Sequence, residues 1–170
     1  MDGIYSLRRL READAGAYRD LRLAGLASDP TSFGASFEEE AGQPLSWFAE
    51  RLASHDVFGG WAADGALMGV VGLLVPHAAK LRHKGVLWGM FVRPEARGTG
   101  LAAALVERAI EHVGDRVEAI RLTVVTTNIP AIRLYTRLGF LTYGLEPRAL
   151  KVEGRYHDEM LMARPSGVPA

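Results

Sequence analysis

A glycine-flanked loop near the middle of the chain separates an uncharged apolar run from an amphipathic segment. The run covers residues 86–92 and is too continuous for a half-exposed strand, so we expect it in the buried middle of a sheet. Residues 99–113 repeat small and apolar side chains at helical spacing, which predicts a helix with one buried face. Because the loop Arg97-Gly98-Thr99-Gly100 opens this helix, the unpaired N–H groups of its first turn predict a site for a phosphate-like anion.

Short strands and helices alternate along the rest of the chain. Gly89, inside the apolar run, predicts a bulge or a close approach of another group to the backbone. Asp64-Gly65 lies between two apolar stretches and predicts a hairpin with a type I′ turn. The expected helices cover 14–26, a segment beginning at Pro44, 99–113 and 128–138, and the expected strands cover 4–8, 57–63, 66–75, 86–92, 119–125, 141–150 and 156–163.

This order of elements predicts an α/β protein of the mixed α+β kind. We expect a single domain with a central, mostly antiparallel sheet flanked by helices, because no linker, repeat or low-complexity segment divides the chain. The domain is expected to cover residues 1–164, with a flexible tail over 165–170.

Composition excludes several classes of function. The 20 Lys and Arg residues balance 20 Asp and Glu residues, so the chain lacks the positive charge of proteins that bind nucleic acid. It has no cysteine, which excludes disulfides, thiolate metal sites and a covalent acyl-cysteine intermediate, and we expect no metal. The sequence shows no secretory signal and no stretch of about 20 apolar residues, which predicts a cytoplasmic protein without a membrane segment.

Two known phosphate-binding loops can be compared with residues 97–103. A Walker loop requires Gly-Lys followed by Ser or Thr, and no lysine occurs between Lys84 and Lys151. The looser dinucleotide fingerprint matches Gly98 to Ala103, but its acidic partner should end a second parallel strand about 20 residues further on. Glu118 has that separation and precedes its strand instead. The loop fits the dinucleotide fingerprint and the acidic partner does not, so a dinucleotide-binding protein is the weaker alternative.

Two motifs together resemble one known family. Arg97-Gly98-Thr99-Gly100-Leu101-Ala102 resembles the Gln/Arg-x-x-Gly-x-Gly/Ala loop of the GNAT superfamily of N-acetyltransferases. Asn128, followed by Ala131, Leu134-Tyr135 and Leu138-Gly139-Phe140, resembles the second acyl-CoA motif of that family. The motifs occur in the family's order and spacing, and the strand order is similar over residues 4–163.

The resemblance implies a site for acetyl-CoA. It assigns Asn128 to the pantetheine arm and Tyr135 to the thiol end, which agrees with local physics because the two lie seven residues apart and share one helix face. The coenzyme-binding residues that it implies are Met90, Phe91, Val92, Arg97, Gly98, Thr99, Gly100, Leu101, Ala102 and Asn128.

The implied reaction moves an acetyl group directly to a primary amine of a small molecule or peptide within a ternary complex. The backbone N–H groups of Met90 and Phe91, beside the expected bulge, would donate to the acetyl carbonyl, and Tyr135 would protonate or hydrogen-bond the leaving sulfur. A catalytically silent acyl-CoA-binding sensor on the same fold is the alternative, and a homodimer is left open.

The general base is not apparent from the sequence. Many family members carry a glutamate in the strand equivalent to 86–92, which has none here. Glu38, Glu39, His83 and Asp158 are candidates that would act through an ordered water. An α-amine, with a pKa near 8, needs less help than a lysine near 10.4, so weak base equipment favours an acceptor of low pKa.

An apolar and acidic segment is expected beside the acceptor. Phe33, Glu39 and Trp88 are the predicted acceptor-binding residues, which favours a cationic amine with an apolar portion. Their alternative interpretation is ordinary helix packing and solvation, and the identity of the amine stays open.

Overall fold

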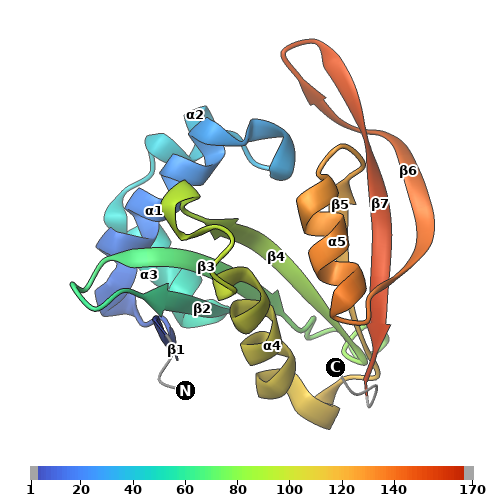
Figure 1. Ribbon diagram of the computed structural model, residues 1–170, viewed down its shortest axis with the longest axis horizontal. Helices are drawn as coiled ribbons and strands as arrows, with labels where there is room; N and C mark the ends of the chain where they lie inside the picture. The colour runs from blue at the N-terminus through green and yellow to red at the C-terminus, as the bar shows by residue number, and fades with distance from the viewer. Residues whose placement is uncertain (1–3, 167–170) are drawn as a thin grey trace.

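The computed structural model describes residues 4–166 and is built on one seven-stranded sheet (Figure 1). The strands lie in the order β1-β2-β3-β4-β5-β7-β6, and every neighbouring pair is antiparallel except β4 and β5. The strands are β1 (Ser6–Arg9), β2 (Asp56–Trp61), β3 (Leu67–Leu74), β4 (Lys84–Val92), β5 (Ala119–Val125), β6 (Leu141–Val152) and β7 (Arg155–Pro165). The predicted mixed, mostly antiparallel sheet with residues 86–92 at its centre is confirmed.

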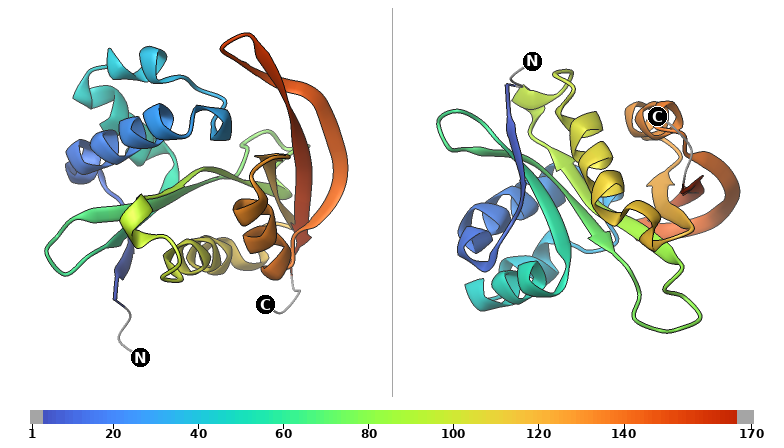
Figure 2. Two further views of the ribbon diagram at one scale, coloured as in Figure 1. Left: turned by 45° about the horizontal axis from the view of Figure 1, so that its top comes forward. Right: turned by 90° about the horizontal axis from the view of Figure 1, so that it is seen from below.

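Helices cover both faces of this sheet (Figure 2). The helices are α1 (Ala15–Ser28), α2 (Phe37–Ala41), α3 (Leu45–Ser54), α4 (Leu101–Val113) and α5 (Ile129–Arg137). Helices α1–α3 lie on one face, and α4 and α5 lie on the other. Successive side chains of a strand point to opposite faces of the sheet, so each face has its own hydrophobic core. Val57 of β2 packs with α1 and α3, and its neighbour Phe58 packs on the side of α4 and α5.

Strands β4 and β5 stay paired over only a short distance. Their parallel register joins Lys84 to Ala119, Gly85 to Ile120 and Val86 to Arg121, and no later residues pair. Beyond these three pairs the strands diverge, so the centre of the sheet opens towards the C-terminal ends of both strands. This opening positions the candidate site.

Gly89 forms the predicted bulge in β4. Val70 pairs with Phe91 and Gly72 with Trp88, so Val71 alone faces the two residues Gly89 and Met90. Gly89 has a φ of +61°, a conformation that glycine adopts without strain. Next to the bulge, Gly72 makes room for its partner Trp88, because a Cβ on Gly72 would lie 2.2 Å from the indole ring.

The turn at Asp64-Gly65 differs from the prediction. A type I′ turn needs a positive φ at both central residues, and of these two only Gly65 has one, at +86°. The Ala62 N–H donates to Ala66 O, and the Asp64 carboxylate accepts from the Ala66 N–H, which gives a longer loop with glycine in the left-handed position. The hairpin of β6 and β7 has positive φ at both of its turn residues, Glu153 and Gly154, as a type I′ turn requires.

The sheet ends near the C-terminus of the described chain. Pro165 is the last residue of β7, and the Ser166 N–H donates to Glu118 O over 2.9 Å. The first two residues of the expected tail therefore lie against the sheet, and residues 167–170 fall outside the described part of the chain. At the other side, β6 forms an edge with Leu141, Tyr143 and Leu145 exposed.

Candidate active site

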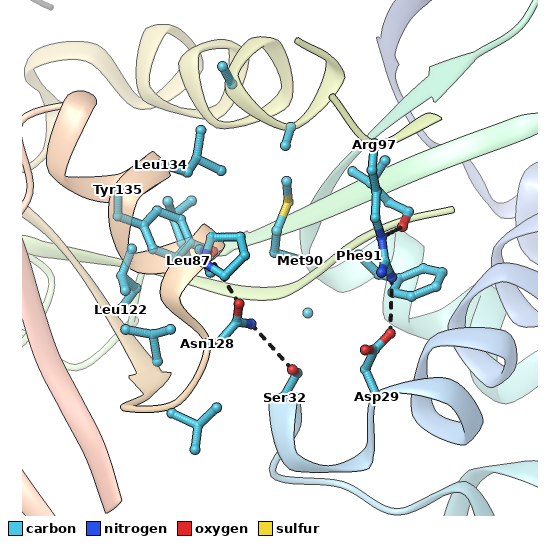
Figure 3. A pocket seen from close by; sticks show the side chains of 18 of the residues that line it. Asp29, Ser32, Leu87, Met90, Phe91, Arg97, Leu122, Asn128, Leu134 and Tyr135 are labelled. Atoms are coloured by element: carbon cyan, nitrogen blue, oxygen red, sulfur yellow. Dashed lines mark hydrogen bonds and ion pairs between the residues drawn. The ribbon is translucent and has the colours of Figure 1, made fainter. Parts of the chain in front are cut away.

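A cavity of about 630 Å³ occupies the opening between β4 and β5 (Figure 3). Its walls come from the diverging strands, from the loop and first turn of α4, from α5, and from the short η2 helix (Pro30–Ser32) with its neighbours. Among the residues that line it are Ser32, Leu87, Trp88, Gly89, Ala103, Leu122, Thr123, Pro130, Ala131, Leu134 and Arg137.

The glycine loop leaves backbone donors at one end of this cavity. Gly98 and Gly100 have φ values of +76° and +88°, so the chain turns sharply before α4 begins at Leu101, two residues after the predicted start. The Ala104 N–H is the first to bond back to the loop, at Gly100 O, which leaves the amides of the first turn without helical partners. These amides and the helix dipole give this end a positive potential.

Arg97 lies at the same end of the cavity as these amides. Its Nε donates to Val92 O over 3.1 Å, which fixes the guanidinium against β4. Its Nη2 forms an ion pair with Asp29, just before η2, at 3.1 Å. Figure 3 shows the Arg97 and Asp29 side chains pointing towards each other, with a dashed line that marks this ion pair.

Helix α5 supplies the opposite wall. The Asn128 side chain accepts from the Ala131 N–H over 3.2 Å, which caps the helix as predicted, and its Nδ2 donates a weak 3.5 Å bond to Ser32 Oγ. Tyr135 is 7% exposed and packs edge-on against Phe140. Burial raises the pKa of the Tyr135 hydroxyl to about 12, so the group stays protonated at neutral pH.

A second cavity of about 400 Å³ adjoins the first at the bulge. The two share Ser32, Phe33, Leu87, Trp88, Gly89, Leu122 and Thr123 in their linings. The second cavity adds side chains from α1, β5, β6 and β7, including Arg22, Arg121, Tyr143 and Glu159. Two compartments therefore meet where β4 bends.

A buried ion-pair network supports the second cavity. Glu40 of α2 accepts from Arg22 Nε at 3.0 Å and Nη2 at 2.8 Å, and also from Arg51 Nη1 at 3.2 Å. Burial alone would raise the pKa of Glu40, but the two guanidinium groups outweigh it and hold that pKa below its usual range. The third nitrogen of Arg22, Nη1, lies 3.3 Å from where a Cβ on Gly89 would be, directly beside the bulge.

The structure brings most of the sequence-predicted site residues to the larger cavity. Those that line it are Phe33, Trp88, Met90, Phe91, Val92, Arg97, Gly98, Gly100, Ala102, Asn128 and Tyr135. Thr99 and Leu101 are outside the lining, because the Thr99 hydroxyl donates to Ala96 O and the Leu101 side chain is buried in the core. Glu39 also lies outside both cavities, with its carboxylate accepting from the Ser36 N–H at the start of α2.

The sequence interpretation missed Glu159, the carboxylate of the second cavity. The adjacent residue Asp158, one of the candidate bases named from the sequence, lies outside both cavities, and its carboxylate accepts a hydrogen bond from the Arg148 N–H. Met160 and Met162 of β7 pack into the core beneath α4 and α5, so period-two alternation places Glu159 on the opposite face, where the cavity lies. This alternation along β7 is the sequence signal that could have identified Glu159.

Comparison with known proteins identifies the family. The model of the acetyltransferase (GNAT) family matches residues 21–140, which include both cavity-lining motifs. The chain belongs to this family.

Two curated relatives match this chain over part of their length. A mycothiol acetyltransferase of Beutenbergia cavernae is 32% identical over 76% of this chain and 42% of the relative. An L-amino acid N-acetyltransferase of Escherichia coli is 35% identical over 45% of this chain and 49% of the relative. The chain thus spans less than half of these two curated relatives.

Solved GNAT structures match the fold almost completely. An acetyltransferase of the GNAT family from Streptococcus pneumoniae has a TM-score of 0.85 at 22% identity, covering 96% of this chain and 99% of that one. A phosphinothricin acetyltransferase of Sinorhizobium meliloti in complex with AcCoA has a TM-score of 0.80 at 20% identity, covering 96% and 89%. Within residues 4–166, no helix is long and apolar enough to cross a bilayer, and no three His, Asp or Glu residues gather as a metal site.

Proposed function

We propose that this GNAT protein transfers an acetyl group from acetyl-CoA to a primary amine of a small molecule or peptide, directly and within a ternary complex. The observation that carries the proposal is the joining of two cavities at the β4 bulge: one has anion-binding features and the other has ionisable side chains. The names of the relatives support it, since they include an L-amino acid N-acetyltransferase and a structure in complex with AcCoA.

The larger cavity has the chemistry to hold the donor. The free amides at the start of α4 and the Arg97 guanidinium would bind the pyrophosphate, which carries the complementary charge. Asn128, on the far wall, would donate to or accept from the pantetheine amides, and the acetyl group would then lie near Gly89 and Tyr135.

The reaction would follow from groups at the seam of the two cavities. The amine nitrogen attacks the thioester carbon, and the bulge at Gly89 and Met90 is the local departure from strand pairing that can turn backbone N–H groups towards the oxyanion. When the C–S bond breaks, the Tyr135 hydroxyl would donate a hydrogen bond to the sulfur. Since a thiol has a pKa near 8.5, Tyr135 would stabilise the thiolate as a donor and keep its own proton.

Two measurements test the proposal. Titration calorimetry with acetyl-CoA, CoA and NAD should show binding of the two coenzyme A species and none of NAD. CoA release, followed with a thiol reagent over a panel of amines, should then depend on one class of amine. Binding of acetyl-CoA without release for any amine would indicate a silent sensor, and binding of NAD alone would indicate a dinucleotide protein.

A further inference from the structure

Two side chains of opposite charge, Arg121 and Glu159, line the second cavity. Within residues 4–166, neither Arg121 nor Glu159 has an ion-pair partner within 4 Å, although both line this cavity. Arg121 Nε is buried without a hydrogen-bond acceptor, and the guanidinium lies 5.3 Å from the centre of the Tyr143 ring. Because Arg121 lines this cavity and takes part in none of the ion pairs within residues 4–166, an anionic group of a bound ligand would supply its missing partner.

Glu159 is also the available base among the residues that line the two cavities. Strand β4 contains no carboxylate, and the linings include two acidic residues, Asp29 and Glu159, and no histidine. Asp29 is ion-paired with Arg97 at the entrance of the larger cavity. Glu159 shares its cavity with Gly89 and Trp88, which also line the larger cavity where the acetyl group would lie.

The surroundings of Glu159 suit a proton acceptor. Burial raises the pKa of its carboxyl, hydrogen bonding to the Thr123 side chain lowers it, and the Glu146 carboxylate on β6 raises it, with a net increase. The other charged or titratable groups that line this cavity are Arg22 of α1, Arg121 of β5 and Tyr143 of β6. A carboxylate whose proton affinity approaches the working pH is better matched to general-base catalysis.

Resting on the proposed function, we propose that the acceptor is a zwitterion, an α-amino acid or a close analogue. Its ammonium group binds Glu159, its anionic group binds Arg121, and Glu159 takes a proton from the ammonium before the nitrogen attacks acetyl-CoA. Arg22 adds to the positive potential beside the bulge, because the network of Arg22, Arg51 and Glu40 holds two guanidinium groups against one carboxylate. Phe33, Trp88 and Tyr143 give the cavity an aromatic wall for an apolar side chain.

The proton balance of this step is complete. One proton passes from R–NH₃⁺ to the Glu159 carboxylate, the free amine forms the C–N bond, and the carbonyl oxygen becomes an oxyanion. As the oxyanion collapses, the C–S bond breaks, the nitrogen loses its second proton and the thiolate takes one up. Each turnover therefore yields the amide and CoA thiol, and releases one proton when Glu159 ionises again.

A matched set of acceptors tests the anionic requirement. L-methionine, L-methioninamide and 3-(methylthio)propylamine share one side chain, and only the first has a carboxylate. The kcat/KM for L-methionine should exceed that for the amide by about tenfold to a hundredfold, the usual value of a charged hydrogen bond. In Arg121→Gln the ratio of kcat/KM for L-methionine to kcat/KM for the amide should fall to near one. Arg133→Gln, an exposed change on α5, is the control and should keep the preference.

The pH profile tests Glu159 separately. Glu159→Gln should lower kcat/KM by roughly 10²–10⁴ at pH 7 with an unaltered affinity for acetyl-CoA. Its loss should shrink as the pH approaches the pKa of the amine, because the neutral amine no longer needs a base. Glu107→Gln removes an exposed carboxylate on α4, outside both cavities, and is the control that should retain activity. Thermal unfolding of each variant checks that the fold is kept.

The outcomes separate this inference from the proposed function. Equal turnover of L-methionine and its amide, or a pH profile of Glu159→Gln equal to that of the wild type, would overturn the inference and leave the acetyltransferase proposal standing. A preference for the amide would indicate a peptide N-terminus as acceptor and would also overturn it. No CoA release with any amine would overturn both.

Discussion

Asp29 forms an ion pair with Arg97, the guanidinium that we propose binds the coenzyme phosphates, so removal of Asp29 should tighten acetyl-CoA binding. The Arg97–Asp29 pair, at 3.1 Å, has side chains 51% and 36% exposed, and such pairs contribute at most about 1 kcal/mol because water and salt screen them. A coenzyme phosphate that binds Arg97 would displace Asp29, so the free energy that the ion pair contributes would be lost on binding. The bond from Arg97 Nε to Val92 O still orients the guanidinium when Asp29 is changed. Asp29→Asn should therefore raise the affinity by about 0.5–1 kcal/mol, which is roughly twofold to fivefold.

Calorimetry on four proteins provides the measurement. Arg97→Ala should weaken acetyl-CoA binding by about 1.5–3 kcal/mol, the range for hydrogen bonds to charged groups. In the double variant, the gain from Asp29→Asn should vanish, because no guanidinium is left to release, and in the single variant it should diminish as salt is raised. If Asp29→Asn weakens binding at low salt, Asp29 orients Arg97 for the coenzyme and the competition argument is wrong.

Three further changes test other parts of the structure. Tyr135→Phe should lower the single-turnover rate by about 10²–10³, as loss of one donor to a developing anion does, with acetyl-CoA affinity nearly constant; a wild-type chemical step would show that Tyr135 only packs. Gly100→Ala should lower the free energy of unfolding by about 1–2 kcal/mol, because φ is +88° there while a Cβ meets no atom within 4 Å, and urea melts that match the wild type would contradict this. Glu40→Ala should destabilise by about 3–5 kcal/mol by leaving Arg22 buried without its partner. The pKa of Glu40 is lower in the folded protein than in the unfolded chain, where it is about 4.3. The Glu40 carboxylate therefore stabilises the fold fully above about pH 4.3, and this stabilisation is lost as the pH falls through the lower folded value. If the wild type and Glu40→Gln lost stability equally on acidification, this role of Glu40 would be refuted.

Elements with a clear period were predicted from the sequence, and geometry set by distant partners was not. The apolar run of β4 and the amphipathic pattern of α4 report burial directly, so their class and approximate bounds follow from local residues. The five-residue α2 is too short for a period to appear. The divergence of β4 from β5 depends on pairing between segments over 30 residues apart, which no local pattern encodes.

The candidate site shows the same division. Arg97, Asn128 and Tyr135 lie in contiguous motifs, and the structure places all three on the larger cavity. Glu159 and Arg121 belong to no motif and line the same cavity only because β5 and β7 are neighbours in the sheet. Sequence reasoning considered Asp158 instead, one residue away, because which face of β7 meets the cavity depends on the register of the whole sheet.

The divergence of β4 and β5 also bears on self-association. An ordinary open sheet has two edges, where unpaired N–H and C=O groups can recruit another chain. Here the separated stretches of β4 and β5 create an additional pair of edges inside the molecule. They are enclosed by η2, α4 and α5, which line the cavity and keep a foreign strand out. A change that detached η2 would therefore do more than alter ligand binding: it would expose a template for aggregation, which a bound ligand would cover again.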